Sequence, residues 1–309
     1  MTIDDEHAAR QALGRLPLYT AAQVRDAHIA RLPGLTNKVF GVAIGGERVC
    51  LRIPGAGAAA IIDRRAEEAN TRAAVKAGVA PELLHFGADG VMVTRFVDEA
   101  LPLSAERFRS VPGAVERAAL ALRKLHDNAP PFATEFDVFA IMDNYVALLR
   151  RRGAELPRGR QAIIREADAI RRALAARPQP LRPCHCDPTG ANLLDTGERV
   201  WIVDWEYSGM NDPTWDLAYL SLQADFDEAQ DRRLLRAYFA RTASAAEAAR
   251  MAVQKALCEL LSALWALLQH SAGNDAADFL GYADRTFRLC RDRMRAPEFA
   301  ENLELVRRG

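Results

Sequence analysis

The hydrophobic pattern of this chain changes once, near Val97, and that change limits the folds the chain can adopt. Before Val97, short runs rich in valine, isoleucine and phenylalanine alternate with turn residues and with one charged helical segment. The expected elements are strands at 38–44 and 47–53, a helix at 61–78, and strands at 82–86 and 91–97. Gly45 and Gly46 join the first two strands, and both can adopt positive φ, which favours a hairpin. This order predicts a small antiparallel sheet with one helix.

The rest of the chain has a helical pattern, with one exception at 193–204. Helices are expected at 113–127, 137–151, 160–176, 214–222, 228–240, 245–270 and 275–292. The exception is a second predicted hairpin, in which 192–195 and 200–204 flank a turn at Thr196-Gly197-Glu198. Residues 1–32 are also expected to be helical. The predicted fold class is therefore α+β and bilobal, with an N-lobe at 1–97, a C-lobe at 98–309 and a cleft between them.

Charge and cysteine content exclude several classes of protein. Lys+Arg and Asp+Glu are both 41 in 309 residues, so the chain lacks the basic excess of a general nucleic-acid binder. The acidic start does not resemble a secretory signal, and we find no apolar run of about 18 residues, the length that spans a bilayer. The five cysteines are sparse and odd in number, which is typical of a reducing compartment. We therefore expect a cytoplasmic protein without a nucleic-acid or membrane partner.

The densest group of chemical residues lies at 185–192, where His185, Asp187 and Asn192 follow the spacing H-x-D-x-x-x-x-N. This is the spacing of a phosphotransfer catalytic loop. Phosphoryl transfer needs a carboxylate for the proton of the attacking hydroxyl, and hard oxygen ligands for Mg²⁺. Asp187 has the first role, and Asn192 and Asp204, which ends the second hairpin, have the other. His185 is expected to support the backbone of the loop near Asp204.

Each of these residues alone also fits a surface turn, in which Pro188 and Gly190 are common. A zinc site at Cys184-His185-Cys186 is disfavoured, because structural zinc sites usually begin with a longer cysteine spacing. The occurrence of His, Asp, Asn and a later Asp in this order favours phosphotransfer over the turn.

The sequence resembles the choline/ethanolamine kinase branch of the aminoglycoside phosphotransferase-like kinases, from about Gly34 to at least Phe287. The matching segments are Gly34-Leu35-Thr36-Asn37, Leu51-Arg52-Ile53-Pro54-Gly55, Ile62-Asp63-Arg64, the loop 185–192 and Val203-Asp204-Trp205-Glu206-Tyr207-Ser208-Gly209. The resemblance implies a bilobal protein-kinase-like fold. It also implies that Asp187 is the catalytic base, that Asn192 and Asp204 bind Mg²⁺, and that Asp216 is a further family acid.

The nucleotide side departs from the protein-kinase pattern. Only four of the 41 basic residues are lysines, and none lies on the strand 47–53, where a phosphate-pairing lysine is expected. Arg52 takes that place, as in the choline kinases that the chain resembles, and a guanidinium can pair with phosphate oxygens. Its expected partner is Glu67 on the following helix, although the adjacent Glu68 leaves the register open.

A Gly34–Lys38 loop stands where protein kinases have a glycine-rich loop. The side chains of Thr36 and Asn37, with the backbone N–H groups, are expected to cover the phosphates, and Lys38 either adds charge or is solvated. Residues 93–97 would form the hinge between the lobes. The backbone groups expected at the adenine edge are those of Arg95, Phe96 and Val97.

A cationic amine acceptor requires negative charge and aromatic faces. Several such residues follow Asp204, and the resemblance adds two rings of a choline site in the C-terminal segments. The candidate acceptor-binding residues are Glu206, Tyr207, Asp216, Trp265 and Tyr282. The family often has another aromatic residue where this chain has Ser262, and packing of the core would equally explain these rings.

The sequence thus predicts a kinase that uses ATP and Mg²⁺ to phosphorylate the hydroxyl of choline or a related small amino alcohol. Ethanolamine, thiamine, an aminoglycoside and another sugar are alternative acceptors. A nucleotide-binding pseudokinase that acts as a scaffold is an alternative of another class, and the sequence leaves a homodimer open.

Overall fold

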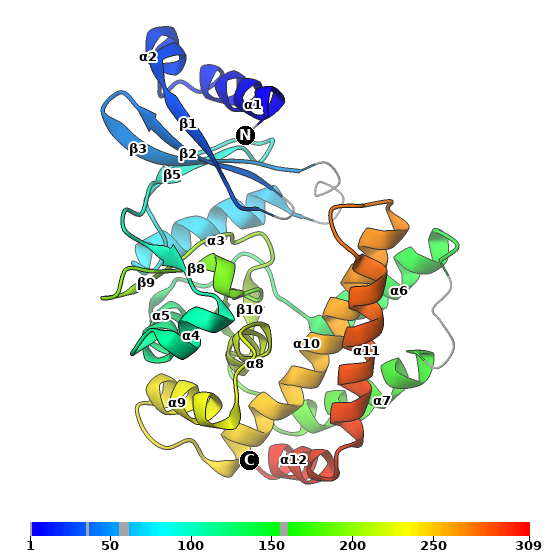
Figure 1. Ribbon diagram of the computed structural model, residues 1–309. Helices are drawn as coiled ribbons and strands as arrows, with labels where there is room; N and C mark the ends of the chain where they lie inside the picture. Colours follow the sequence, from blue (N-terminus) through cyan, green and yellow to red (C-terminus); the bar gives the residue numbers. More distant parts are fainter. Residues whose placement is uncertain (1, 35–36, 56–61, 155–159) are drawn as a thin grey trace.

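The computed structural model describes the chain except residues 1, 35–36, 56–61 and 155–159 (Figure 1). We call the first sheet with its three helices the N-lobe, and the helical remainder the C-lobe. The N-lobe contains α1 (Ile3–Gly14), α2 (Ala21–Asp26), β1 (His28–Leu32), β2 (Lys38–Ile44), β3 (Glu47–Ile53), α3 (Arg64–Lys76), β4 (Leu83–Phe86) and β5 (Met92–Arg95). Its sheet has the order β1-β2-β3-β5-β4, and every pair of neighbouring strands is antiparallel.

The β2–β3 hairpin agrees with its prediction to the residue. Gly45 and Gly46 form its turn with φ of +59° and +85°, the left-handed conformations that a tight hairpin requires. Phe40 and Leu51 are paired across the hairpin and are fully buried on its inner face. The expected antiparallel sheet is confirmed, and its strand β3 carries Arg52.

The expectation that residues 1–32 are helical is wrong for the last of them. His28–Leu32 is the strand β1, in which Ile29 pairs with Val42 of β2. A five-residue segment carries little pattern of its own, so the free edge of β2 selects its conformation. The helix α2 does begin as its sequence indicates, because Thr20 and Gln23 form a capping box.

Helix α3 lies between the sheet and the C-lobe (Figure 1). It begins after Asp63, whose carboxylate accepts hydrogen bonds from the N–H groups of Arg65 and Ala66, which explains a start at Arg64 and not at residue 61. Its buried face includes the polar residues Glu67, Asn70 and Thr71. Buried polar groups need partners, so this helix contributes to polar contacts between the lobes.

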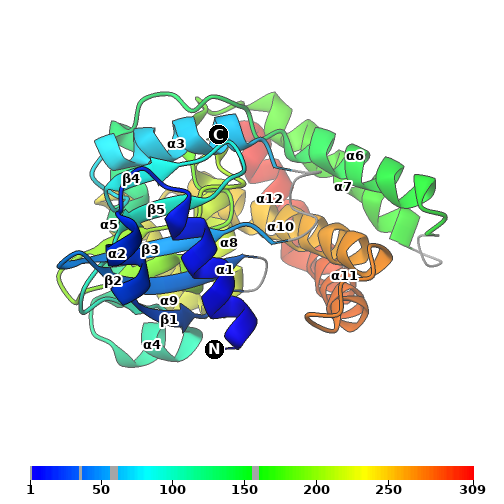
Figure 2. The ribbon, with the colours of Figure 1, turned by 90° about the horizontal axis from the view of Figure 1, so that it is seen from above.

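The C-lobe is mainly helical, as expected. Its elements are β6 (Leu101–Pro102), α4 (Ala105–Ser110), α5 (Ala114–Asn128), α6 (Val138–Arg151), α7 (Arg160–Ala176), β7 (Arg182–Cys184), the 3₁₀ helix η2 (Gly190–Asn192), β8 (Leu193–Asp195), β9 (Val200–Ile202), β10 (Gly209–Asn211), α8 (Thr214–Gln223), α9 (Glu228–Phe239), α10 (Ala245–Ser271), α11 (Phe279–Arg295) and α12 (Pro297–Arg308). Viewed from above, α6, α7, α10 and α11 extend to one side of the sheet (Figure 2).

Three details of the C-lobe differ from the prediction. The strands β7 and β10 pair with each other, and β6 pairs with β8, so 193–204 is not the only extended stretch. Helix α11 begins at Phe279 and not at residue 275, because Asp278 caps it through the N–H of Gly281. Helices α4 and α12 were not expected, and α12 begins at Pro297, a residue that favours the first helical turn.

Two separate hydrophobic clusters are found among the described residues. The smaller lies between the N-lobe sheet and α1 and α2, and the larger fills the C-lobe and includes Ala73 and Ala74 of α3. The antiparallel sheet followed by the large helical part confirms the predicted α+β fold. Helix α10 is long and apolar enough to cross a membrane, but 89% of its apolar window is buried, and α6, α8, α11 and α12 pack against it. Its apolar composition therefore serves the core of the C-lobe.

Candidate active site

Asp216 on α8 holds the start of the loop 185–192 in place. The two carboxylate oxygens accept hydrogen bonds from the N–H groups of His185 and Cys186, each at 2.8 Å. These bonds stabilise Cys186 at a φ of +66°, which is costly for a residue with a side chain. Asp216 is fully buried, and His126 lies 3.0 Å from it and 2.8 Å from the hydroxyl of Tyr238. We therefore propose that Asp216, a sequence candidate for the acceptor site, positions the loop.

His185 has the supporting role that the sequence predicts. Its Nε2 lies 3.0 Å from the carbonyl oxygen of Val203, and its Nδ1 accepts a bond from the N–H of Asp187 at 3.3 Å. Burial lowers the pKa of His185, so the ring is neutral, with its proton on Nε2. The imidazole thus ties the loop before Asp187 to the strand before Asp204.

Asn192 and Asp204 are brought together by the β8–β9 hairpin. The side-chain Nδ2 of Asn192 donates to the carbonyl oxygen of Asp187 at 3.0 Å, and the N–H of Val203 donates to the carbonyl of Asn192 at 3.0 Å. Asp204 has a φ of +68°, a strained conformation of the kind found at functional sites. The amide oxygen of Asn192 is left as the group that can bind a cation.

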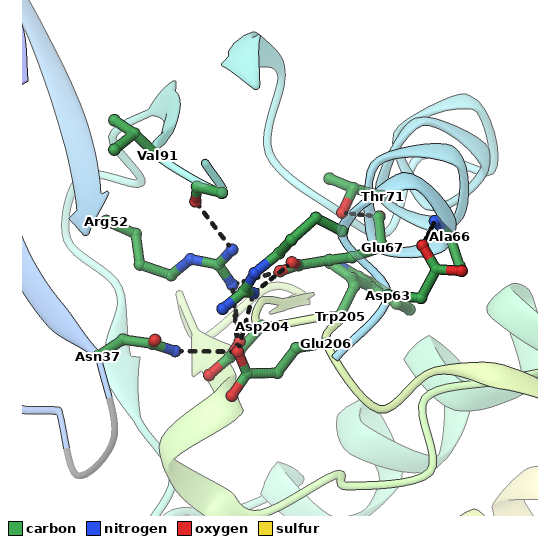
Figure 3. A network of polar contacts seen from close by, with 12 residues as sticks. Asn37, Arg52, Asp63, Ala66, Glu67, Thr71, Val91, Asp204, Trp205 and Glu206 are labelled. Atoms are coloured by element: carbon green, nitrogen blue, oxygen red, sulfur yellow. Dashed lines mark hydrogen bonds and ion pairs between the residues drawn. The ribbon is translucent and has the colours of Figure 1, made fainter. Parts of the chain in front are cut away.

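Arg52 stands opposite Asp204, as Figure 3 shows. Its Nη1 lies 2.5 Å from Oε1 of Glu67 and 3.0 Å from Oδ1 of Asp204, and the side chains of Arg52 and Glu67 are 4% and 0% exposed. Burial lowers the pKa of Arg52, but Asp204 and Glu67 outweigh that effect and raise it. Glu68 is only half-buried and pairs with Arg72, so the partner of Arg52 is Glu67.

Glu206 belongs to the same cluster of charges. Its Oε2 lies 3.3 Å from Nη1 of Arg64, which also lies 2.6 Å from Glu67, and it accepts a hydrogen bond from Asn37 at 3.3 Å. Its side chain is only 3% exposed. Burial, together with the charge of Asp204, raises the pKa of Glu206. The structure thus places Glu206 against the N-lobe, where Arg64 already meets its charge.

The donor set beside Arg52 fits a hard divalent cation. Carboxylate oxygens of Glu67, Asp204 and Glu206 lie within 4.8 Å of one another. The Asp204 side chain is 30% exposed, whereas the other two are nearly inaccessible, so Asp204 is the carboxylate that solvent and ligands can reach. Oxygen ligands of this kind are those that Mg²⁺ prefers.

Asp187 is half-buried near the start of the loop 185–192. Loss of solvent around its carboxyl and, to a smaller extent, the charges of Asp204 and Glu206 raise the pKa of Asp187 to about 7. A hydrogen bond from Tyr219 opposes this shift. A carboxyl with a pKa near the working pH is suited to accept a proton from an alcohol.

We expect turnover at limiting substrate to fall below about pH 7, by about tenfold per pH unit, because a base must be ionised to act. A bound cation lowers the pKa of Asp187, so kcat at saturation should fall only at lower pH than kcat/KM does. The pH dependence of both parameters tests this. In the Glu206→Gln variant the acid limb of kcat/KM should persist, and its disappearance would assign the limb to Glu206.

Aromatic side chains from four segments surround Asp187. Burial raises the pKa of Tyr145, Tyr207 and Tyr219, and the charge of Asp187 contributes in each case. Trp265 lies near the hydroxyl of Tyr207, and Asp187 and Ser262 lie near that of Tyr219. Tyr145, Tyr219 and Trp265 belong to α6, α8 and α10. The structure therefore brings Tyr207 and Trp265 together near the candidate base.

Tyr282 of α11 belongs to the same group, because it lies close enough to Tyr219 to affect the pKa of that residue. The ring of Trp265 also packs edge-to-face on Phe279, with centroids 5.6 Å apart. A pocket of about 200 Å³ is lined by Tyr207 together with Glu206, Tyr145, Phe136 and Glu135, among other residues. The neighbourhood is thus both aromatic and acidic, the combination that an organic cation requires.

The remaining nucleotide-side candidates lie as follows. Thr36 falls outside the described residues. Asn37 is buried and also accepts a bond from the N–H of Gly55 at 3.4 Å. Lys38 pairs with Asp5 at 2.9 Å.

Of the hinge candidates, Arg95 is the last residue of β5, and Phe96 and Val97 follow it. The N–H groups of Arg95 and Phe96 are bonded to the carbonyls of Glu82 and Arg48. The Arg95 side chain pairs with Glu47 and Glu82, away from the cleft. The adenine contact remains a prediction. The N–H groups of Arg95 and Phe96 do not contribute to it, because they already donate to these carbonyls.

Sequence reasoning missed Arg64, Tyr145 and Tyr219 as site residues. Tyr219 lies one helical turn after Asp216, so both are on the same side of α8. This spacing could have predicted Tyr219 from the sequence. Arg64 lies within a motif that the resemblance used, but its contacts to Glu67 and Glu206 depend on the fold. No local signal marks Tyr145.

Comparison with known proteins agrees with the fold. The phosphotransferase enzyme family matches residues 28–253, from β1 into α10. The chain therefore belongs to the phosphotransferase enzyme family. Within it, a choline/ethanolamine kinase family protein from Mesorhizobium loti is 46% identical, with a TM-score of 0.88 over 99% of this chain and 100% of that one.

One further curated relative and one further solved structure are similar to this chain. Protein LicA of Haemophilus influenzae is 27% identical over 268 residues, which are 82% of this chain and 98% of the relative. The crystal structure of choline kinase LicA from Streptococcus pneumoniae shares the fold, with a TM-score of 0.73 and 23% identity over 86% of this chain and 93% of that one. The predicted resemblance to the choline/ethanolamine kinase family is confirmed.

Proposed function

We propose that this protein is a kinase that transfers the γ-phosphate of ATP, with Mg²⁺, to the hydroxyl of choline or a related amino alcohol. The observation that carries the proposal is the position of Asp187. The charge of Asp204, which pairs with Arg52, reaches its carboxyl, and this carboxyl in turn acts on Tyr207, which lies beside Trp265. An alcohol with a cationic group can therefore meet both the base and a nucleotide.

Each side chain has a defined part in the reaction. Arg52, held by Glu67, meets the charge of the phosphates, and Asn192 and Asp204 hold the cation. Bound Mg²⁺ supplies charge neutralisation on the phosphates. Asp187 accepts the hydroxyl proton as the bond from the acceptor oxygen to phosphorus forms and the bond to ADP breaks. Positioning and electrostatics account for most of the catalysis in such reactions.

The aromatic residues near Asp187 are the basis for the proposed acceptor. A quaternary ammonium group has no N–H donor, so ring faces and nearby acids must hold it. Tyr207, Trp265 and Tyr282 provide rings, and Ser262 stands where the family often has another ring. These features support a small organic cation, with ethanolamine, thiamine or an aminoglycoside as alternatives to choline.

An ADP-release assay with choline, ethanolamine, thiamine and an aminoglycoside tests the proposal. We expect choline or ethanolamine to give the highest kcat/KM, and no turnover without Mg²⁺. In the Trp265→Ala variant the KM for the acceptor should rise at least about tenfold, the loss expected for one cation–π contact of about 1.4 kcal/mol, while the KM for ATP stays constant.

The other outcomes have definite meanings. Equal effects of Trp265→Ala on both KM values would show that the ring packs the core and does not contact the acceptor. Preference for thiamine or an aminoglycoside would keep the chemistry and change the acceptor. Tight binding of Mg·ATP without turnover over a wide amine panel would favour a pseudokinase scaffold, and the proposed kinase would be abandoned.

A further inference from the structure

Asn70 on α3 joins two segments of the C-lobe. Its Nδ2 donates to the carbonyl oxygen of Ser208 at 3.0 Å and to its hydroxyl oxygen at 3.1 Å, while its Oδ1 accepts from the N–H of Ala133 at 2.8 Å. The side chain is 1% exposed. A buried amide that is bonded in this way fixes the positions of all three partners, because water cannot replace a lost bond.

Ser208 closes the turn that carries the charged residues of the site. Its hydroxyl donates to the carbonyl of Trp205 at 2.6 Å, and its N–H donates to the same oxygen at 3.1 Å. The turn 204–208 contains Asp204, with its left-handed backbone, as well as Glu206 and Tyr207. A contact that holds Ser208 therefore holds the backbone of the turn.

Asn70 lies three residues after Glu67 on the same helix face, so one surface of α3 carries both contacts. Glu67 meets Arg52 and Arg64, and Asn70 meets the turn that presents Asp204 to that same Arg52. The distance between α3 and the turn thus sets whether Arg52 can lie between Glu67 and Asp204. Hydrogen bonds to Ser208 and Ala133 define that distance.

We propose that Asn70 is a positioning residue that fixes the turn 204–208 to α3, and so sets Asp204 for cation binding before any nucleotide is present. The proposal rests on the proposed function only in treating Asp204 as a cation ligand. Its consequence is that α3 moves with the C-lobe turn as one body. The helix is then not free to swing away from the site.

The test compares Asn70→Leu, which keeps the approximate size but forms no hydrogen bond, with Thr71→Val. Thr71 is the matched control, because it is buried on the same helix and bonds only to the carbonyl of Glu67. We expect amide hydrogen exchange at 204–208 to accelerate at least about tenfold in Asn70→Leu, as for the loss of a buried hydrogen bond. Thr71→Val should leave exchange at that turn unchanged.

A second readout uses Mg²⁺ and ADP on the full chain. The Mg²⁺ concentration for half-maximal tightening of ADP binding should rise about tenfold in Asn70→Leu, while ADP affinity without Mg²⁺ is unchanged. If amide hydrogen exchange at 204–208 is as slow in a folded Asn70→Leu protein as in the wild type, the proposal is overturned. If that variant does not fold, Asn70→Ala is measured in the same way, with the same two results deciding.

Failure of the proposed function would look different. A wild-type protein that binds no Mg·ADP, or that phosphorylates no acceptor, would contradict the kinase assignment. The exchange experiment would still decide whether Asn70 fixes the turn, because it requires neither nucleotide nor metal.

Discussion

The Asp187→Asn variant should lose turnover by about 10²–10⁴-fold, the contribution typical of a general base, while its ADP affinity stays within about twofold of the wild type. Asparagine has nearly the same shape as aspartate but cannot take a proton from the acceptor hydroxyl. The backbone of residue 187 should stay in place, because its bonds to His185 and Asn192 involve main-chain atoms. Steady-state kinetics with a calorimetric measurement of ADP binding test this expectation.

The same variant should be more stable than the wild type at pH 8. The pKa of Asp187 is raised to about 7 in the folded protein from an ordinary value of 3.8. At a pH between these two values, the folded state therefore holds a proton that the unfolded state has lost. Wild-type stability therefore declines as the pH rises through this range, and asparagine removes that decline. The difference in Tm should shrink toward zero near pH 4.

This pair of results separates a base from a structural residue. A structural aspartate would lower both turnover and Tm when it is replaced. Turnover within a few-fold of the wild type would remove Asp187 from the mechanism. A Tm that falls at pH 8 would mean that its carboxylate is well stabilised and that its pKa is not raised.

The N-lobe hairpin could be predicted from sequence because the evidence for it is local. Gly45 and Gly46 determine the turn, and the alternation of β2 and β3 then fixes the register. The catalytic loop could be found for the same reason, since His185, Asp187 and Asn192 lie within one short segment. A resemblance to known kinases added Arg52, whose role depends on a helix outside that segment.

Other parts of the site depend on contacts that no local pattern encodes. Glu67 and Glu68 are adjacent, so only the packing of α3 decides which of them faces Arg52. Gly190 resembles an ordinary turn residue, but a Cβ there would lie 1.7 Å from the carbonyl oxygen of Leu103, so close packing requires glycine. The sequence shows that residue 216 is an acid, but only the structure shows that the carboxylate oxygens of Asp216 accept hydrogen bonds from backbone N–H groups.

The strand β1 and the partners of Glu206 illustrate the same limit over longer distances. His28–Leu32 becomes a strand only because β2 offers an edge. Glu206 was expected to face the acceptor, and the structure gives it Arg64 and Asn37 from the N-lobe. Long-range pairing of charges therefore decides how an acidic residue is used, after the sequence has placed it near the site.

The largest combined loss of stability and function is expected for Arg52→Met. Methionine fits the buried position but leaves the carboxylates of Glu67 and Asp204 without their shared cation. Breaking a buried ion pair by removing one partner typically costs about 3–5 kcal/mol. We expect the lower end of this range, because Arg64 still contacts Glu67 at 2.6 Å and Asp204 is 30% exposed. Nucleotide affinity should fall at the same time.

A double variant distinguishes the two effects. In Arg52→Met with Glu67→Met the buried charge and its partner are both absent, so most of the lost stability should return, as is often found when apolar residues replace a buried pair. Nucleotide affinity should not return, because the phosphates still lack the guanidinium. Thermal unfolding and ADP binding, measured on the wild type, both single variants and the double variant, form a complete cycle. Recovery of both properties would mean that Arg52 only neutralises Glu67. Recovery of stability alone would show that a buried arginine, in the place of the usual lysine, binds the phosphates.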